Sequence, residues 1–411
     1  MTAGALRDSA ERHRQKAAQQ TAALRAELPL RYLRQQAHLT APASDAKLAE
    51  KALSNATGVA SRLLDRYGLD AEAVGERLGV DAGVVTSVLE EVGAPVVVLD
   101  LEDGVPPHLV DAARANVVRL AREIDRGRTL CFVRPPGITD PRCADDLVSM
   151  LVDAGHGLAA NRYPIDGIVF PKVRHVHEVR WLDELLAKIE KDVSLPPDSI
   201  RVCFLVETGW GVAKLPELAA AGLNRLAGII LGTVDLGADV LLPEVRFEHP
   251  IAEWARMMIV TVAGACGVPA IDGMTLDFPV GRPELDAQAN RKFVLDRMAT
   301  NFNDALHSID LGMSGRWVGH PLQLVATLLA FRSFFSEDSI REHVATLEEF
   351  SRAIANDLGA VAASSGQLLD IGTDRHVRQL LRRATAWGLL SADRAHELHL
   401  ITDLERRAYT T

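Results

Sequence analysis

The stretch VVVLDLEDGVPP, at positions 96–107, ends an apolar run in several carboxylates. The apolar residues VVVL are followed at once by Asp100, Glu102 and Asp103. Moving a carboxylate out of water is costly unless a cation or hydrogen-bond donors compensate its charge. These side chains therefore either emerge into solvent at the end of a strand or face something positive.

Further ionisable residues follow other apolar runs, far apart along the chain. They are Arg134, Lys172, Glu207, Asp235 and His320. Glu207 directly continues the run CFLV, and Asp235 interrupts IILGTVDLGADVLL. Any one of them alone is compatible with an ordinary polar strand end. As a set they predict one shared site, provided that the fold brings the ends of these runs together.

Eight short apolar runs alternate with helical stretches along the chain. Continuous Val, Ile and Leu runs are typical of strands buried on both faces, and their alternation with helices indicates a parallel sheet. Eight such units predict an α/β fold, a closed (β/α)8 TIM barrel, whose reactive groups gather at the C-terminal ends of the strands. The expected strands are residues 36–42, 95–103, 129–134, 166–172, 202–207, 226–235, 268–273 and 315–321.

Three regions lie outside this eightfold pattern. Residues 1–34 predict a helical N-terminal arm, and residues 336–411 predict a helical C-terminal extension. Within the barrel region, 35–335, residues 54–94 predict a helical insertion after the first strand. Part of it, 69–93, has the spacing of a helix-turn-helix, but its second helix carries carboxylates rather than the basic and amide side chains that meet DNA. We interpret it as a helical hairpin that covers one flank of the barrel.

The composition is that of an acidic globular protein. The chain has 411 residues, of which 48% are hydrophobic and 24% charged, and its formal net charge is −10. No basic field would attract nucleic acid or an anionic membrane. No run approaches ~20 apolar residues, residues 1–20 lack the apolar stretch expected of a signal peptide, and the four cysteines lack metal-binding spacing. We therefore expect a cytoplasmic protein with no nucleic-acid or membrane partner.

The motifs at these strands resemble those of a known family. They occur in order as LDLEDGV (99–105), VRPPG (133–137), DGIVFPKV (166–173), LVETGWGV (205–212), GTVDLGAD (232–239), GVPAIDGM (267–274) and GRWVGHPLQL (315–324). Together with HLTAPASDAKLAEKAL (38–53), they resemble the citrate lyase β-subunit-like and malyl-CoA lyase-like enzymes of the HpcH/HpaI aldolase superfamily. The resemblance covers residues 36–325, the whole expected barrel.

This resemblance implies a lyase or aldolase that makes or breaks a carbon–carbon bond next to a 2-oxo acid. The oxo acid would be glyoxylate, pyruvate or oxaloacetate, and the enolate donor an acyl-CoA or a free acid. The implied cofactor is Mg²⁺, with Mn²⁺ as an alternative, and its implied ligands are Glu207 and Asp235. Carboxylate oxygens suit this hard cation, which would act as a Lewis acid toward the oxo acid.

The resemblance also implies roles for other strand-end residues. Arg134 would grip the substrate carboxylate with its planar fork, a geometry that Lys lacks. Glu102 and Asp103 would orient water in the outer coordination shell of the metal, whereas Asp100 would have a structural part.

Further groups are expected to bind the anionic parts of the substrate. The backbone N–H groups of Gly232, Thr233 and Val234 would support its carboxylate. Lys172 and Arg316 are the cations expected to meet an anionic tail.

Two positions depart from the family pattern. Val110 stands where the family has the Lys of K-x-x-A-R, although Arg114 is retained. The first loop reads APASDAK, so that Lys47 is its nearest cation. Basic residues at these places help to bind the phosphates of coenzyme A, and a CoA thioester and a free acid therefore both stay open as the donor.

The general base and the assembly are left open as well. The candidates for the base are His175, His177, His320, Asp370 and Asp374. The resemblance implies a homo-oligomer, a trimer or a hexamer. A thioester hydrolase on the same site, and a non-catalytic regulatory or binding barrel, are the alternative functions.

Overall fold

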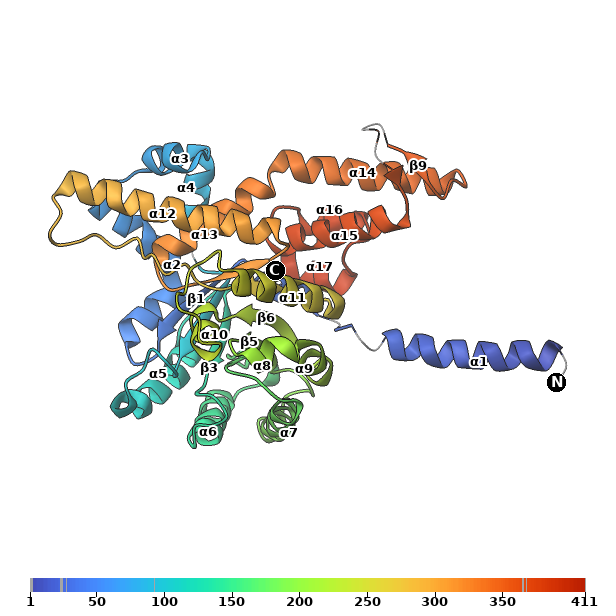
Figure 1. The fold of residues 1–411 in the computed structure, drawn as a ribbon, viewed down its shortest axis with the longest axis horizontal. Coiled ribbons are helices and arrows are strands. Elements are labelled where there is room, and N and C mark those ends of the chain that lie inside the picture. The colour runs from blue at the N-terminus through green and yellow to red at the C-terminus, as the bar shows by residue number, and fades with distance from the viewer. Residues whose placement is uncertain are drawn as a thin grey trace.

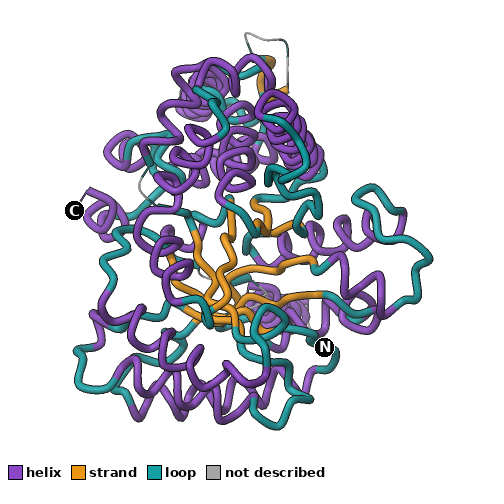
Figure 2. The backbone as a smooth tube through the Cα atoms, turned by 90° about the vertical axis from the view of Figure 1, so that its left-hand side faces the viewer, coloured by secondary structure: helices purple, strands orange, loops and turns teal. Residues whose placement is uncertain are grey.

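The computed structural model describes residues 3–22, 25–26, 28–91, 93–363, 366 and 368–410. Eight parallel strands close into a barrel in sequence order, with the last strand paired to the first (Figure 2). The predicted TIM barrel is therefore confirmed. Its strands are β1 (Ala37–Pro42), β2 (Val96–Asp100), β3 (Leu130–Arg134), β4 (Gly167–Phe170), β5 (Arg201–Val206), β6 (Leu226–Leu231), β7 (Ala270–Asp272) and β8 (Gly315–Val318).

Helices connect the strands and surround the barrel (Figure 1). They are α2 (Ala46–Arg66), α3 (Ala71–Leu78), α4 (Ala82–Glu90), η2 (Pro107–Leu109), α5 (Val110–Glu123), α6 (Cys143–Gly155), η3 (Ala160–Arg162), α7 (Val176–Asp192), α8 (Gly209–Ala213), α9 (Leu215–Ala221), α10 (Thr233–Asp239), α11 (Pro250–Cys266), α12 (Ala287–Asp310) and α13 (Pro321–Phe334). Because helices cover the outside and side chains fill the inside, strands such as β2, β3 and β4 are buried at every position.

One glycine shows how closely the barrel backbone is packed. A Cβ atom on Gly315, at the start of β8, would lie 1.9 Å from the carbonyl oxygen of Gln35. That distance leaves no room for a side chain, so glycine is required for the chain before β1 to lie against β8.

The connection between β1 and β2 is helical from Ala46 onward and consists of α2, α3 and α4. Aspartates begin all three helices: the side chain of Asp45 accepts from two backbone N–H groups, as does Asp81, and Asp70 accepts from one. Gly79, with φ 69°, ends α3 in the left-handed conformation that favours glycine. The helices α3 and α4 pack against each other and against α12 and α13, as expected of a hairpin that covers a flank.

The regions before and after the barrel are mainly helical. They contain α1 (Ala3–Ala22), η1 (Leu30–Leu33), α14 (Glu337–Ala355), α15 (Ile371–Ala386), α16 (Ala392–Glu397) and α17 (Asp403–Thr410). The C-terminal region also holds a small antiparallel pair, β9 (Val361–Ala362) with β10 (Leu368–Leu369), which the helical prediction did not include. The helix α1 projects from the body of the molecule (Figure 1). The division of the chain into domains at these borders stays a prediction.

Within the described part of the chain, no helix is both long enough and apolar enough to cross a membrane.

Candidate functional site

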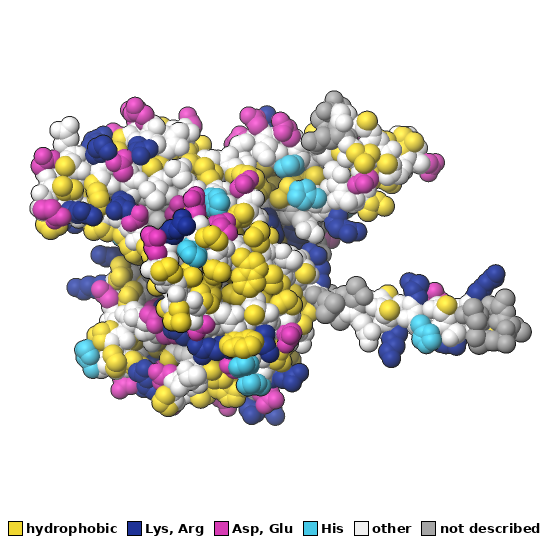
Figure 3. Space-filling view, viewed as in Figure 1, with side chains coloured by type: hydrophobic (Ala, Val, Ile, Leu, Met, Phe, Trp, Pro, Cys, Tyr) yellow, Lys and Arg dark blue, Asp and Glu magenta, His cyan; other side chains and the backbone are white. Residues whose placement is uncertain are grey.

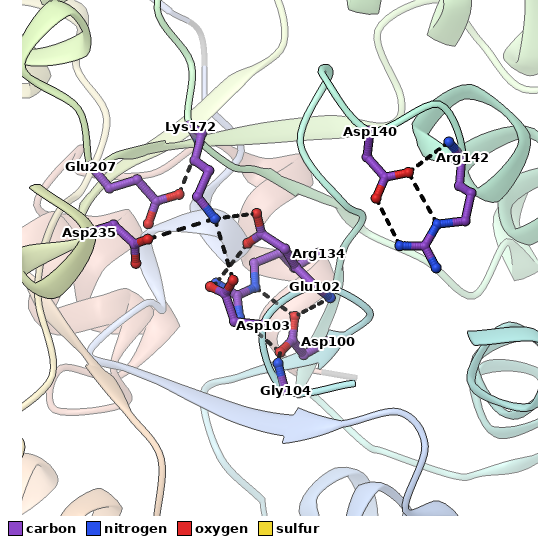
Figure 4. A network of polar contacts seen from close by, with 10 residues as sticks. All are labelled: Asp100, Glu102, Asp103, Gly104, Arg134, Asp140, Arg142, Lys172, Glu207 and Asp235. Carbon is purple, nitrogen blue, oxygen red and sulfur yellow. Dashed lines mark hydrogen bonds and ion pairs between the residues drawn. The ribbon is translucent and has the colours of Figure 1, made fainter. Parts of the chain in front are cut away.

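The C-terminal ends of five neighbouring strands, from β2 to β6, bring charged side chains together at one mouth of the barrel (Figure 4). In the parallel register, Asp100 of β2 pairs with Arg134 of β3. Val206 of β5, which precedes Glu207, pairs with Leu231, the last residue of β6. Residues that are distant in sequence thereby become neighbours. The set assembled here is Asp100, Glu102, Asp103, Arg134, Lys172, Glu207 and Asp235.

Arg134 is held by the carboxylate beside it. Its Nε and Nη2 atoms donate to the two oxygens of Asp100 at 2.6 Å and 2.8 Å. Its Nη1 atom points to Glu102 at 3.1 Å and to Asp103 at 3.4 Å. Burial alone would lower the pKa of Arg134, but the hydrogen bonds and charges of these carboxylates raise it. Arg134 is therefore a permanent cation whose Nη1 edge faces the mouth.

The ammonium group of Lys172 lies among the carboxylates (Figure 4). Its Nζ atom is 2.7 Å from Glu102, 3.4 Å from Asp103 and 3.8 Å from Asp235. Burial disfavours the charged form and would lower the pKa of Lys172, but the hydrogen bond and negative charge of Glu102 outweigh this effect and raise it. The Lys172 backbone has φ 53°, an uncommon value for a residue with a side chain, and its N–H donates to Glu207 at 2.9 Å.

Glu207 is the buried carboxylate of the site, with 2% of its surface exposed. Burial raises its pKa to about 8, and the negative charges of Glu102 and Asp235 act in the same direction. Lys172 and Arg134 oppose this shift but do not cancel it. A buried carboxylate whose ionised form is disfavoured by burial and by neighbouring negative charges is one that a bound cation would stabilise.

The oxygens of Glu207 and Asp235 fit a divalent cation. Oε1 of Glu207 accepts from Lys172, whereas among the described residues Oε2 accepts no hydrogen bond. A Cβ atom on Gly232 would lie 2.5 Å from this Oε2. Only glycine at position 232 therefore leaves room for the Oε2 atom in its observed position. The described residues contain no cluster of three or more His, Cys, Asp or Glu arranged as a metal site. Two carboxylates suffice for Mg²⁺, which keeps several of its waters.

The segment after β6 presents backbone N–H groups beside these carboxylates. The Gly232 N–H donates to Val206 within the barrel at 3.0 Å and is not available to a substrate. Thr233 and Val234 occupy the first turn of α10, where N–H groups have no partner inside the helix. Asp235 follows them, and its side chain is 40% exposed toward solvent.

The candidates for a general base lie in different settings. The rings of His175 and His177 stack on each other at 5.1 Å, half-buried and exposed respectively. His320 caps α13, where its Nδ1 accepts from the Leu322 N–H, and burial lowers its pKa to about 4. Asp370 caps α15, and Asp374 pairs with Arg378 in the same helix. Both aspartates thus have structural partners within the C-terminal region.

Arg316 does not meet solvent, contrary to its expected role at an anionic tail. It is 1% exposed, and its Nη2 atom donates to Gly273 and Thr275 in the segment after β7. The prediction was wrong because Arg316 belongs to β8 itself, and its side chain packs against protein.

Two other cations lie near the predicted site. Lys47 is exposed, in the first turn of α2. Arg142 forms an ion pair with Asp140 in the loop after β3 (Figure 4), a pair that the sequence reading missed because no motif marks it.

Comparison with known proteins agrees with this geometry. Residues 82–282 match the family model of the HpcH/HpaI aldolases and citrate lyases. L-malyl-CoA/beta-methylmalyl-CoA lyase of Rhodobacter capsulatus is 28% identical over 313 residues, which cover 71% of this chain and 87% of that protein. Citrate lyase subunit beta of Leuconostoc mesenteroides subsp. cremoris is 30% identical over 183 residues, 44% of this chain and 56% of that protein.

Solved structures share the fold. A citrate lyase from Burkholderia xenovorans LB400 has a TM-score of 0.60 at 20% identity and covers 91% of this chain and 97% of its own. CitE from Mycobacterium tuberculosis, solved with magnesium, acetoacetate and coenzyme A, has a TM-score of 0.52 at 24% identity and covers 85% of this chain and 98% of its own.

Proposed function

Because the barrel of this chain belongs to the HpcH/HpaI aldolase/citrate lyase family, we propose that the protein is a Mg²⁺-dependent carbon–carbon lyase. Its substrate would be a CoA-linked hydroxy acid that it cleaves to an acyl-CoA and a 2-oxo acid, or forms from them. The oxo acid would be glyoxylate, pyruvate or oxaloacetate. The observation that carries this proposal is the meeting of Glu207, Asp235, Arg134 and Lys172 at one barrel mouth.

Glu207 and Asp235 would hold the cation. When bound, a divalent cation polarises the oxo-acid carbonyl and offsets the negative charge that develops on the enolate oxygen. Glu102 and Asp103 would fix the positions of the surrounding waters, since both already bond to Lys172 and Arg134. Mn²⁺ accepts the same ligands and would serve as well.

Arg134 and Lys172 would bind the carboxylate of the oxo acid. The Nη1 edge of Arg134 contacts Glu102 at 3.1 Å and Asp103 at 3.4 Å, and an incoming carboxylate would replace the longer contact to Asp103. The Lys172 ammonium is partly exposed at the mouth. The N–H groups of Thr233 and Val234 would add donors at the start of α10.

The first loop offers a place for the anionic tail of a thioester. Lys47 and Lys51 are exposed on the first turns of α2. Lys51 also borders a small apolar pocket beside the ends of β1 and β8, together with Leu48 and Pro321. Two lysines beside an apolar wall would suit the phosphates and pantetheine chain of coenzyme A.

The setting of the protein is also part of the proposal. A cytoplasmic location is supported by the four cysteines, which are all free and buried. We propose a homo-oligomer, a trimer or a hexamer, in which the C-terminal helices lie at the interface.

Proton exchange at the α-carbon in D₂O, followed by NMR, tests the proposed function. The panel would be pyruvate, oxaloacetate, acetyl-CoA and propionyl-CoA, each with and without glyoxylate and with Mg²⁺ or a chelator. We expect exchange into one donor that requires metal and is lost in Glu207→Gln. Exchange that persists in the chelator or in this variant would contradict the metal assignment. Release of free CoA without an oxo acid would indicate a thioester hydrolase instead.

A further inference from the structure

A second cavity lies at the end of the barrel opposite to the candidate site. Its volume is about 570 Å³, and its wall includes Leu33 and Val268, which precede β1 and β7. The N-terminal ends of the strands therefore border this cavity, whereas Glu207 and Asp235 lie beyond their C-terminal ends. The rest of the wall comes mainly from α11, α15, α17 and the segment after α1, where the Ala26 N–H donates to Cys266 at the end of α11.

Three arginines, Arg25, Arg382 and Arg383, line this cavity in a protein of net charge −10. Arg382 is neutralised by a two-point ion pair with Glu405, the carboxylate in the wall. For Arg25 and Arg383, the described residues provide no hydrogen bond or ion pair to the guanidinium group. Figure 3 shows Lys and Arg side chains gathered in the hollow between the C-terminal helices and the base of α1.

The two unpaired guanidinium groups line the same cavity, in which Arg383 is half-buried and Arg25 is exposed. Burial lowers the pKa of Arg383, and the positive charge of Arg25 adds to this effect. Arg25 lies against Gly267, where a Cβ atom would come within 2.9 Å of its Nε. Like charges kept together in a partly buried cavity are costly unless an anion compensates them.

We propose that this cavity binds a small organic phosphate. The forked guanidinium groups of Arg25 and Arg383 match the oxygens of a phosphate dianion, which two such groups would neutralise. The apolar part of the wall, Leu28, Pro29, Leu33 and Leu404, would contact the organic body of the ligand. The volume is in the range of cavities that hold small molecules, about 300 to 1,000 Å³.

Isothermal titration calorimetry with AMP, adenosine and inorganic phosphate tests this proposal on the full chain. AMP should bind, inorganic phosphate should bind more weakly, and adenosine should give no heat. Arg383→Gln and Arg25→Gln should each weaken AMP binding about tenfold, the loss expected for one charged hydrogen-bonding partner. Arg62→Gln removes an exposed arginine of α2 and should change nothing. Glu207→Gln should also leave AMP binding unchanged, which separates this cavity from the proposed metal site.

Several outcomes would overturn the proposal. They are no binding of AMP or phosphate at millimolar concentration, equal binding by wild type and Arg383→Gln, and equal binding of AMP and adenosine. Thermal unfolding shows whether the variants fold. Without ligand, Arg383→Gln should have a Tm equal to or above that of the wild type, because it relieves the repulsion with Arg25. AMP should raise the Tm of the wild type and not that of the variant.

Discussion

Arg134 at the end of β3 donates two hydrogen bonds to its register partner Asp100 at the end of β2. Both residues are nearly inaccessible to solvent, with 8% and 2% of their surfaces exposed. Asp100 also accepts from the backbone N–H groups of Glu102 and Gly104, which fixes the loop that carries the two outer carboxylates. A single buried aspartate thereby positions both the cation and the anions of the candidate site.

Replacing Asp100 by Asn should destabilise the protein markedly. The substitution removes the carboxylate that accepts the two shortest hydrogen bonds of the buried Arg134 guanidinium. Breaking a buried pair in this way costs about 3 kcal/mol or more. Urea unfolding, followed by circular dichroism, measures the loss. The control is Asp111→Asn. The Asp111 side chain pairs with Arg114 but is 89% exposed, so this variant should lower the free energy of unfolding by less than about 1 kcal/mol. Equal effects of the two variants would contradict the structural role of Asp100.

Gly232→Ala should impair metal binding while the protein still folds. The new Cβ atom would lie 2.5 Å from both Cβ and Oε2 of Glu207, so the carboxylate must move. We expect Mg²⁺ affinity, measured by calorimetry, to fall at least about tenfold. Gly264→Ala is the matched control, since a Cβ atom there meets nothing within 4 Å. It should leave metal binding unchanged and stabilise α11 by up to about 1 kcal/mol. Unchanged affinity in Gly232→Ala would remove Glu207 from the metal site.

The barrel could be predicted because each of its strands is marked by a local sequence pattern. Each strand is a continuous apolar run, such as VVVLD in β2 or LCFVR in β3. The expected strand 226–235 was too long, because β6 ends at Leu231 and α10 begins at Thr233. Given eight parallel strands, the rule that strand ends share one mouth is enough to place Glu207 beside Asp235.

Features that depend on side-chain packing could not be predicted in the same way. Arg316 and Lys172 both look like strand-end cations in the sequence, yet one packs against protein and the other enters the carboxylate cluster. The difference arises because Arg316 lies within β8, whereas Lys172 lies two residues beyond the end of β4. The cavity that Arg25 and Arg383 line is formed by residues from near both ends of the chain, and no local sequence pattern predicts that these residues lie together.

Lys172→Met should bind Mg²⁺ more tightly but turn over more slowly. The Lys172 ammonium lies within 4 Å of Glu102, Asp103 and Asp235 and therefore repels a cation that approaches the same carboxylates. Removing one nearby positive charge should strengthen Mg²⁺ binding about tenfold. The KM for the oxo acid should rise, because a carboxylate-binding group is lost. The control is Lys188→Met, on the exposed side of α7. Weaker Mg²⁺ binding in Lys172→Met would show that the lysine supports the metal site rather than competing with it.

Acid should destabilise the protein partly through His320. In the folded chain its Nδ1 accepts the N-cap hydrogen bond of α13, and burial lowers its pKa to about 4. In the unfolded chain its pKa returns to about 6.5. Between these values the unfolded chain binds more protons, so the stability that neutral His320 contributes is complete above about pH 6.5 and is lost as the pH falls toward 4.

The variant His320→Asn isolates this contribution. Asparagine keeps an N-cap acceptor for α13 but does not titrate, so the free energy of unfolding should fall less steeply below about pH 6.5 than in the wild type. Urea unfolding of both proteins at about pH 7.5 and about pH 4.5 measures the difference. The free energy of unfolding of the variant, relative to that of the wild type, should be higher at the lower pH than at the higher pH. If the difference in free energy of unfolding between the two proteins is the same at both pH values, the pKa of His320 does not change on unfolding, and the prediction is wrong.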